Sequence, residues 1–391
     1  MSEDIIALSI PNFSGNEKKY VNDAIDSEWV STAGAFISRF EEEIAKKVGV
    51  TGACACQSGT AGLHLCLRYL GVSEKDIVLV PTLTFIATIN AVLYQCAEPI
   101  FFDCNDHMCI DVDQIEWYLT HECHLKGDKV VDKETGKAVK AIIPVHVFGD
   151  HCDMQSLMRL ADKYHLYVIE DACESLGGVF GEGRYKGKYT GTVGHFGVYS
   201  FNGNKIITTG GGGMVVSEDA DAVNYIRYLS QQAKDDALYF IHNEYGYNYR
   251  MTNLQAALGL AQLELLDNYV NIKRANYRKY CEKLEVCDYA RMLDFVSGDN
   301  SNHWFYSFML NKPDKDKRDR LIAYMNGHNI QVRPIWKLNN LQKPFRKYRA
   351  MDCSRAEKFY NSIINIPCST NLTDEQIERV CKILLNFETL Q

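Results

Sequence analysis

The sequence predicts an α/β protein: a mainly parallel β-sheet with helices on both faces, followed by a smaller α+β domain. Between residues 53 and 216, short apolar segments alternate with segments of helical period. The apolar segments, such as 77–80 and 139–145, are continuous, which is typical of strands buried on both faces. Beyond residue 260 this alternation becomes sparser. We therefore expect an N-terminal arm and a large domain over 1–259, and a small domain over 260–391.

The individual elements follow from periodicity and from capping residues. Apolar residues at helical spacing predict helices at 16–25 and 36–48, and a long helix from 253 to 284. Asp153, and the pair Thr373 and Gln376, are expected to cap two further helices. The polar segment 124–138 is expected to be a solvated insertion. Strands are expected at 53–56, 77–80, 99–103, 139–145, 166–170, 194–200, 214–216, 304–310 and 330–335.

The composition argues against several classes of protein. The chain has 391 residues, a formal net charge of −8 and no block of lysine and arginine, so we expect no nucleic-acid partner. Its 14 cysteines include no CxxC pair and its N-terminus is acidic, which indicates reduced thiols in the cytoplasm. No apolar run is long enough to cross a bilayer. The segment 121–124 (His-Glu-Cys-His) has no second cluster of ligands near it, so we expect no metal site.

Candidate ligand-binding residues follow the predicted strands. Ligands of such folds bind beyond the carboxyl ends of the strands, and Thr60, Phe85 and Asp171 each come just after a strand. The stretch Ser58-Gly59-Thr60 opens a helix, whose free N–H groups can hold an anion. A plain helix cap by Ser58 or Thr60 is an equally good interpretation. No G-x-G-x-x-G follows the first strand, which disfavours a dinucleotide site.

Lys205 lies in a loop between two predicted strands, after a polar turn at 202–204 and before four glycines at 210–213. A lysine shielded from water can act as an amine nucleophile, whereas a solvated loop lysine is the competing interpretation. The amine, the carboxylate of Asp171, the ring of Phe85, the hydroxyl of Ser200 and the helix N-terminus at Gly59 are together the groups that pyridoxal phosphate needs. Their order along the chain favours a site for this cofactor.

Seven segments carry a resemblance to a known family. They are Trp29-Val30-Ser31-Thr32, Ser58-Gly59-Thr60-Ala61, Pro81-Thr82-Leu83-Thr84-Phe85-Ile86-Ala87-Thr88, Pro144-Val145-His146, Glu170-Asp171-Ala172, Ser200-Phe201-Asn202-Gly203-Asn204-Lys205 and Gly246-Tyr247-Asn248-Tyr249-Arg250-Met251-Thr252. Through them the chain resembles the nucleotide-sugar aminotransferase family of fold type I pyridoxal phosphate enzymes (the DegT/DnrJ/StrS group) over nearly its whole length. The resemblance implies an aspartate aminotransferase-like large domain on a seven-stranded, mainly parallel sheet.

The resemblance also implies roles at the matching positions. Lys205 is implied to form the Schiff base with the cofactor and to move protons, and Asp171 to pair with the ring nitrogen. Glu174 stands where relatives often have a glutamine that contacts the ring hydroxyl, so we expect its role to differ. Asn248 is implied to reach the phosphate in a partner subunit, and hence a homodimer. Phe85 is implied to stack on the ring, Gly59, Thr60 and Ser200 to hold the phosphate, and Arg250, Arg333 and the segment 15–40 to contact the sugar.

Some of these positions have ordinary structural alternatives. Asn248 and Arg250 alone read as a polar turn before a long helix, and Arg333 as a surface residue. Asp171 alone reads as a capping aspartate, and Phe85 as a core residue.

The expected activity is transfer of the amino group of L-glutamate to a sugar ketone. The segments 15–17, 200–205 and 333–336 are most similar to enzymes that aminate position 4 of a UDP-linked 4-keto-6-deoxy-N-acetylhexosamine. Amination of GDP-4-keto-6-deoxymannose, as in perosamine synthesis, and amination at position 3 are the enzymatic alternatives. A related dehydratase branch has histidine in place of Lys205, which argues against it. A non-enzymatic pyridoxal phosphate-binding regulator is the last alternative, and Lys205, Asp171 and the absence of a DNA-binding motif argue against that.

Overall fold

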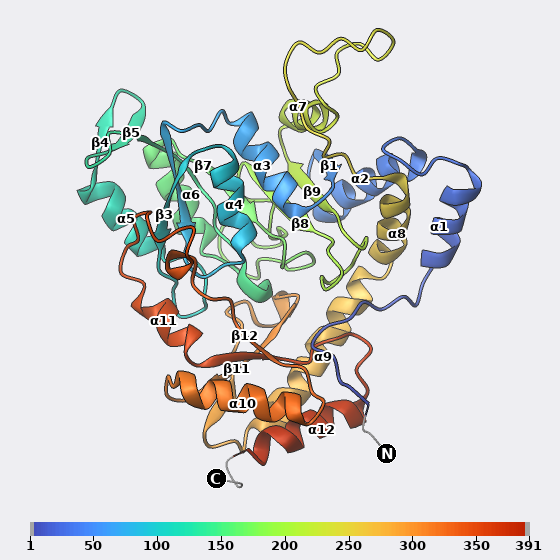
Figure 1. Cartoon of the computed structure of the whole chain (residues 1–391), viewed down its shortest axis with the longest axis vertical. Helices are drawn as coiled ribbons and strands as arrows, with labels where there is room; N and C mark the ends of the chain where they lie inside the picture. Colours follow the sequence, from blue (N-terminus) through green and yellow to red (C-terminus); the bar gives the residue numbers. More distant parts are fainter. Residues whose placement is uncertain (1–3, 388–391) are drawn as a thin grey trace.

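The large domain of the computed structural model, which describes residues 4–387, is built on one central sheet (Figure 1). Seven strands run in the order β1-β9-β8-β7-β6-β2-β3. The five strands β8, β7, β6, β2 and β3 are parallel, and β9 is antiparallel to its neighbours β1 and β8. This confirms the mainly parallel sheet. The strands are β1 (Gly52–Cys56), β2 (Asp76–Pro81), β3 (Glu98–Phe102), β6 (Ala138–Ile142), β7 (Tyr167–Asp171), β8 (Phe196–Ser200) and β9 (Gly213–Ser217).

Helices cover both faces of this sheet, because each central strand sends apolar side chains to both sides. In β2, Val78 and Val80 pack with α3 (Gly59–Tyr69), α4 (Ile86–Tyr94) and α7 (Ala220–Ser230). Ile77 and Leu79 point to the other face and pack with α5 (Val112–His121) and α6 (Met154–Tyr164). On that face β1, β8 and β9 are covered by α2 (Ala35–Val48) and α8 (Asn253–Leu263), against which α1 (Glu17–Asp26) lies.

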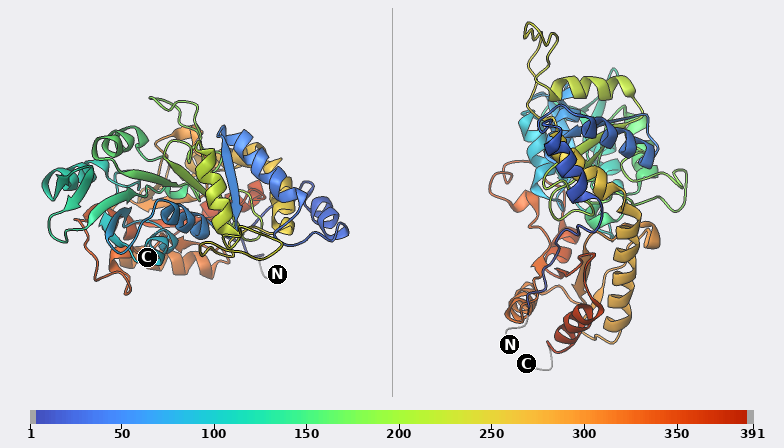
Figure 2. Two further views of the ribbon diagram at one scale, coloured as in Figure 1. Left: turned by 90° about the horizontal axis from the view of Figure 1, so that it is seen from above. Right: turned by 90° about the vertical axis from the view of Figure 1, so that its right-hand side faces the viewer.

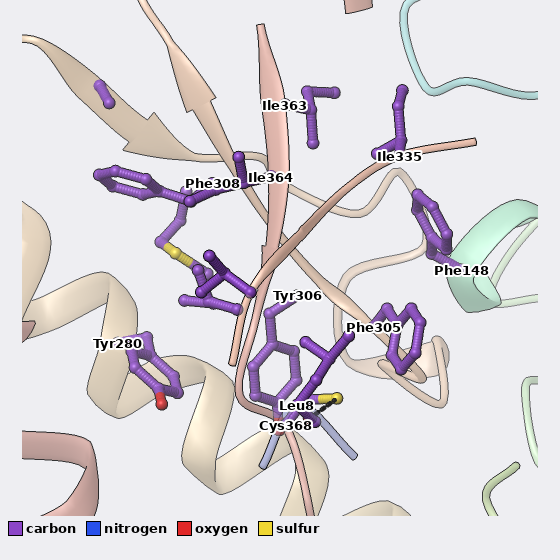
Figure 3. Close-up of a cluster of buried hydrophobic side chains, with 14 of the residues drawn as sticks. Leu8, Phe148, Tyr280, Phe305, Tyr306, Phe308, Ile335, Ile363, Ile364 and Cys368 are labelled. Carbon is purple, nitrogen blue, oxygen red and sulfur yellow. Dashed lines mark hydrogen bonds between the residues drawn. The ribbon is translucent and has the colours of Figure 1, made fainter. Parts of the chain in front are cut away.

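The small domain is a four-stranded antiparallel sheet with helices against it. The strand order is β10-β11-β13-β12. Figure 3 shows its core, in which Phe308 from β11 lies beside Ile364 from β13. Its elements are α9 (Leu266–Leu284), β10 (Ala290–Met292), β11 (Tyr306–Leu310), α10 (Lys315–Gly327), β12 (Arg333–Pro334), α11 (Ser354–Tyr360), β13 (Ile363–Ile366) and α12 (Asp374–Leu385). Short 3-10 turns lie at Gly298–Asn300 and Asn339–Leu341 and, in the large domain, at Val147–Gly149 between β6 and α6.

Two segments tie the domains together. The N-terminal segment runs beside the small domain (Figure 2, right), where Ile6 pairs with Ile330 and the carbonyl of Leu8 accepts from the Cys368 amide at 2.9 Å. In the opposite direction, the chain after β12 returns to the large sheet, where the Met351 amide donates to the Phe101 carbonyl at 2.8 Å. A cavity between the domains is therefore bounded by chain from both.

Three expectations about individual elements are wrong in detail. The insertion 124–138 contains a hairpin, β4 (Cys123–Lys126) and β5 (Lys129–Asp132), because Gly127 takes a φ of +61° in the turn and Val130 is buried against the sheet. The helix expected over 253–284 is two helices, which break at residues 264–265. The strand expected at 330–335 forms ladder pairs only at Arg333 and Pro334. The helix caps by Asp153 and by Thr373 with Gln376 are confirmed. None of the helices among the described residues combines the length and the apolar character needed to span a membrane.

Candidate functional site

A cavity of about 510 Å³ lies at the carboxyl ends of β1, β2, β7 and β8, with the small domain on its other side. Most of the residues expected to bind a cofactor line it. Two tryptophans and a threonine that had no assigned role also line it. The lining residues that matter here are Gly59, Thr60, Phe85, Thr88, Asp171, Cys173, Glu174, Ser200, Lys205, Trp304, Arg333 and Trp336.

The amine of Lys205 is held inside this cavity. The turn after β8 is closed by the Lys205 amide, which donates to the Asn202 carbonyl at 3.0 Å. The Nζ atom lies 3.6 Å from Oε1 of Glu174 and 3.8 Å from the centre of the Trp304 ring. Only 13% of the Lys205 side chain is exposed. The solvated-loop interpretation of this lysine is therefore wrong.

The carboxylate of Asp171 ends β7 and is 5% exposed. Its Oδ2 atom accepts a hydrogen bond from the Thr88 hydroxyl at 2.7 Å, and its Oδ1 atom accepts one from the Cys173 amide at 3.2 Å. The carboxylate has no basic partner among these contacts, so it is a buried acceptor on the cavity wall. Such an acceptor suits a protonated ring nitrogen.

Glu174 is a second buried carboxyl group, and it lies beside Lys205. Burial raises its pKa to about 7, while the Lys205 ammonium and the Phe148 amide, which donates to Oε2 at 2.9 Å, oppose that rise. A glutamine would offer one carbonyl oxygen and one amide group here. The carboxyl group of Glu174 instead changes its charge near neutral pH.

The N-terminus of α3 forms another part of the wall. Ser58 is the helix cap, since its hydroxyl accepts from the Ala61 amide at 3.1 Å. The cap by Ser58 is confirmed. It is compatible with an anion site, which stays a prediction, because Gly59 and Thr60 at the helix end line the cavity together with Ser200. A Cβ atom at Gly59 would lie 2.5 Å from the Cys173 sulfur, so only glycine lets the helix end approach this closely. Burial raises the pKa of the Cys173 thiol well above its ordinary value, so this sulfur is a packing group.

Aromatic rings surround the remaining side. Phe85 is 53% exposed and lies 6.2 Å, centre to centre, from Trp336. Trp304 is buried, and its Nε1 donates to the Asn204 carbonyl at 2.7 Å, directly before Lys205. Arg333 is exposed and lines the cavity from β12. Phe85 is therefore not a core residue but an open ring face.

Arg250, Asn248 and the segment 15–40 do not line this cavity. The Arg250 guanidinium is buried and donates hydrogen bonds to both carboxylate oxygens of Glu41, with Nη2 3.2 Å from Oε2. Glu41 also accepts from the Ala55 amide at 2.7 Å, so this pair joins α2 to β1. The geometry gives Arg250 a structural role instead of the expected sugar contact. Asn248 is exposed on the arm between α7 and α8, outside the cavity, and its role stays a prediction. From the segment 15–40 no residue lines the cavity either.

The groups on the cavity wall fit pyridoxal phosphate. They supply an amine for its aldehyde, a buried carboxylate for its ring nitrogen, an open aromatic face for its ring, and a helix N-terminus with hydroxyls for its phosphate. The crowding at Gly59 keeps that helix end free of a side chain. Among the described residues, no group of three or more histidine, cysteine, aspartate or glutamate side chains is arranged to hold a metal ion.

Known proteins of similar sequence cover almost the whole chain. EpsN of Bacillus subtilis (strain 168), which carries the name of a pyridoxal phosphate-dependent aminotransferase, is 38% identical over 99% of this chain and 97% of its own. GDP-perosamine synthase of Escherichia coli O157:H7 is 36% identical over 96% of this chain and 97% of its own. UDP-4-amino-4,6-dideoxy-N-acetyl-beta-L-altrosamine transaminase of Campylobacter jejuni subsp. jejuni (serotype O:23/36, strain 81-176) is 29% identical over 95% of this chain and 94% of its own.

The fold and the family model agree with these relatives. The crystal structure of the aminotransferase TlmJ from Streptoalloteichus hindustanus superposes with a TM-score of 0.88, at 22% identity and 99% coverage of both chains, and shows the same fold. The model of the DegT/DnrJ/EryC1/StrS aminotransferase family matches residues 11–385. The chain therefore belongs to the DegT/DnrJ/EryC1/StrS aminotransferase family and is a pyridoxal phosphate-dependent sugar aminotransferase.

Proposed function

We propose that the protein transfers the amino group of L-glutamate to position 4 of a UDP-linked 4-keto-6-deoxy-N-acetylhexosamine. The observation that carries the proposal is the Lys205 amine, held beside Glu174 and Trp304 in the cavity that Asp171 and Phe85 also line. The same catalytic set serves for several nucleotide sugars. The choice of sugar rests on the segments 15–17, 200–205 and 333–336 and on the Campylobacter jejuni relative.

The residues of the chain have separate tasks in this reaction. When bound, pyridoxal phosphate supplies an aldehyde and a ring that withdraws electrons. Lys205 would hold the aldehyde of the cofactor, and its Nζ would move a proton as a general base and acid. Asp171 accepts a hydrogen bond from the ring nitrogen and keeps it protonated. The N-terminus of α3 and Ser200 hold the phosphate, and Phe85 orients the ring.

A GDP-linked 4-keto-6-deoxymannose is the second candidate substrate. The specific observation in its favour is the 36% identity to GDP-perosamine synthase, above the 29% identity to the UDP-sugar transaminase. Arg333, exposed at the cavity beside Trp336, is the cation that we propose for the sugar nucleotide.

The substrate is tested by incubating the protein with pyridoxal phosphate, L-glutamate and a panel of UDP- and GDP-linked keto sugars. Mass spectrometry follows the exchange of a ketone oxygen for an amine. We expect amination at position 4 of the UDP-N-acetyl sugar. Turnover of the GDP sugar alone selects the second candidate. Oxygen loss without gain of an amine, or amination at position 3, overturns both.

We also propose a homodimer with shared sites. The arm between α7 and α8 projects from the body at the top of Figure 1 and carries Leu238, Tyr239 and Phe240, each 71–75% exposed. Contiguous apolar side chains on a surface are typical of a protein interface. Asn248 lies at the base of this arm, so a second copy docked there brings it near the partner's phosphate site. The pattern of fourteen cysteines with no CxxC pair is the basis on which we propose a reducing, cytoplasmic setting.

Shared sites predict that two inactive variants rescue each other. We expect Lys205→Ala and Asn248→Ala proteins, unfolded together and refolded as a mixture, to regain up to about a quarter of wild-type activity, because half of the dimers are mixed and each has one intact site. Each variant refolded alone is the control. If the mixture has no more activity than the separate variants, although mass spectrometry detects mixed dimers, Asn248 does not act across the interface.

The raised pKa of Glu174 predicts that the difference in stability between the wild type and a Glu174→Gln variant depends on pH. Its folded pKa of about 7 exceeds the ordinary 4.5, so its favourable contribution is fully present below pH 4.5 and is lost as pH rises through 7. Glutamine does not titrate. In cofactor-free protein we therefore expect the free energy of unfolding of Glu174→Gln, minus that of the wild type, to increase by about 3 kcal/mol between about pH 4.5 and 7. Urea unfolding measures it. A difference that does not vary with pH contradicts the assignment.

A further inference from the structure

The carboxylate of Asp171 is oriented by groups that have no assigned role in the reaction. Its Oδ2 atom accepts from the Thr88 hydroxyl at 2.7 Å. Its Oδ1 atom accepts from the Cys173 amide at 3.2 Å. Thr88 belongs to α4, whereas Cys173 comes just after β7, so the two donors come from separate parts of the chain. The carboxylate is therefore fixed at both oxygens before any ligand binds.

The direction of the hydrogen bonds follows from the number of protons available. An ionised carboxylate only accepts, so the Thr88 hydroxyl must give its single proton to Asp171. The Thr84 hydroxyl lies 3.0 Å from the Thr88 hydroxyl and must then donate to it. Thr84, Thr88 and Asp171 are 1%, 1% and 5% exposed, so water does not compete for these bonds. The two hydroxyls form a chain of donors that ends on the carboxylate.

The outer end of this chain is braced by the segment after β12. The Asn339 side-chain amide donates to the Thr84 carbonyl at 2.7 Å and to the Thr82 carbonyl at 3.1 Å. The Asn339 main-chain amide donates to Thr82 as well, at 2.9 Å. The turn from β2 to α4 that presents Phe85 to the cavity is thus the turn that aligns the two hydroxyls.

We propose that Thr88, with Thr84 behind it, is a positioning residue that holds the carboxylate of Asp171 turned toward the ring nitrogen of the cofactor. Hydrogen bonds donated to a carboxylate favour its charged form, and a charged acceptor is what a protonated ring nitrogen requires. The inference rests on the role proposed above for Asp171. It extends that role to a residue that acts only through the carboxylate.

The test uses full-length protein loaded with pyridoxal phosphate that is ¹⁵N-labelled in its ring. The ¹⁵N chemical shift separates the protonated from the neutral ring nitrogen, and equilibrium dialysis gives the Kd of the cofactor. The variants are Thr88→Val, which keeps the shape, Thr88→Ser, which restores the hydroxyl, and Thr84→Val, which removes the second donor. Thr82→Val is the matched control, because Thr82 is equally buried in the same turn and its hydroxyl donates to Asn340 at 2.7 Å, away from Asp171.

We expect Thr88→Val to move the ring nitrogen toward the neutral shift and to raise the Kd up to about tenfold, because a less well oriented carboxylate makes a weaker charge-assisted hydrogen bond to the ring nitrogen. Thr84→Val should do the same to a smaller extent, and it carries the test if Thr88→Val does not fold. Thr88→Ser and Thr82→Val should match the wild type. The inference is overturned, and the role of Asp171 is not, if Thr88→Val has the ¹⁵N shift and the Kd of the wild type. The same outcome in Thr84→Val counts in this way if Thr88→Val does not fold. An equal change in the control Thr82→Val also overturns the inference. A neutral ring nitrogen in the unsubstituted protein overturns the role of Asp171 with it.

Discussion

Replacing Lys205 by alanine is expected to abolish transamination. Among the described residues that line the cavity, Lys205 alone carries an amine that can bond to the cofactor aldehyde and carry the proton, and it lies beside Glu174 and Trp304. Loss of one general acid–base group costs about 10²- to 10⁴-fold in rate, and here the nucleophile is lost with it. We expect turnover with L-glutamate below about 10⁻⁴ of the wild-type rate, and loss of the visible absorbance of the lysine-bound cofactor.

The matched control for this variant is Lys186→Ala, at an exposed lysine outside the cavity. It should keep the absorbance and the rate. Because Lys205 is a cavity residue and not a core residue, the alanine variant should also keep its thermal unfolding midpoint in the absence of cofactor within a few degrees. Measurable turnover by folded Lys205→Ala would rule out the assignment.

Replacing Asp171 by asparagine is expected to leave the fold intact and to slow the half-reaction with L-glutamate by on the order of 10³-fold. Asparagine has the same size and can still accept from Thr88, but it cannot hold a positive charge on the ring nitrogen. The neutral ring withdraws electrons less strongly, so the chemical step slows more than binding does. Stopped-flow absorbance measures the half-reaction, and titration of the cofactor gives its Kd.

Asp150→Asn is the control for burial of an aspartate. Asp150 is 3% exposed and its carboxylate accepts from the Val296 amide at 2.9 Å, outside the cavity. This control should change stability and leave the half-reaction rate within a few fold. A near-normal rate in Asp171→Asn, or an equal loss of rate in both variants, would count against a role at the ring nitrogen.

The large domain could be predicted because local signals and tertiary packing agree there. Continuous apolar strands such as 77–80 are possible only between two layers of helices, and the structure has both layers. The hairpin at 123–132 was missed because its two strands have four residues each and lie in a segment rich in charged residues, although Cys123, Val130, Val131 and Asp132 are buried. The break between α8 and α9 could not be predicted, because no proline or glycine lies there in the sequence.

The cofactor side of the site could also be predicted, since its residues stand at strand ends. The small-domain side could not. Trp304 is placed under Lys205 by packing across the two domains, and nothing near position 304 in the sequence indicates that contact. The role of Thr88 could not be predicted either, because it depends on the hydrogen bond from its hydroxyl to Asp171, which only the structure shows. Arg250 was assigned to the sugar through the family resemblance, and its pairing with Glu41, 209 residues away in the sequence, is visible only in the structure.

The central claim is that the Lys205 nitrogen bonds covalently to the cofactor. Protein loaded with pyridoxal phosphate is reduced with sodium borohydride, which makes that bond permanent, and is digested for peptide mass spectrometry. The account predicts a pyridoxyl phosphate adduct on Lys205 in nearly every molecule, and none in protein first treated with L-glutamate. An adduct on another lysine, or no adduct in protein that has bound the cofactor, would contradict it.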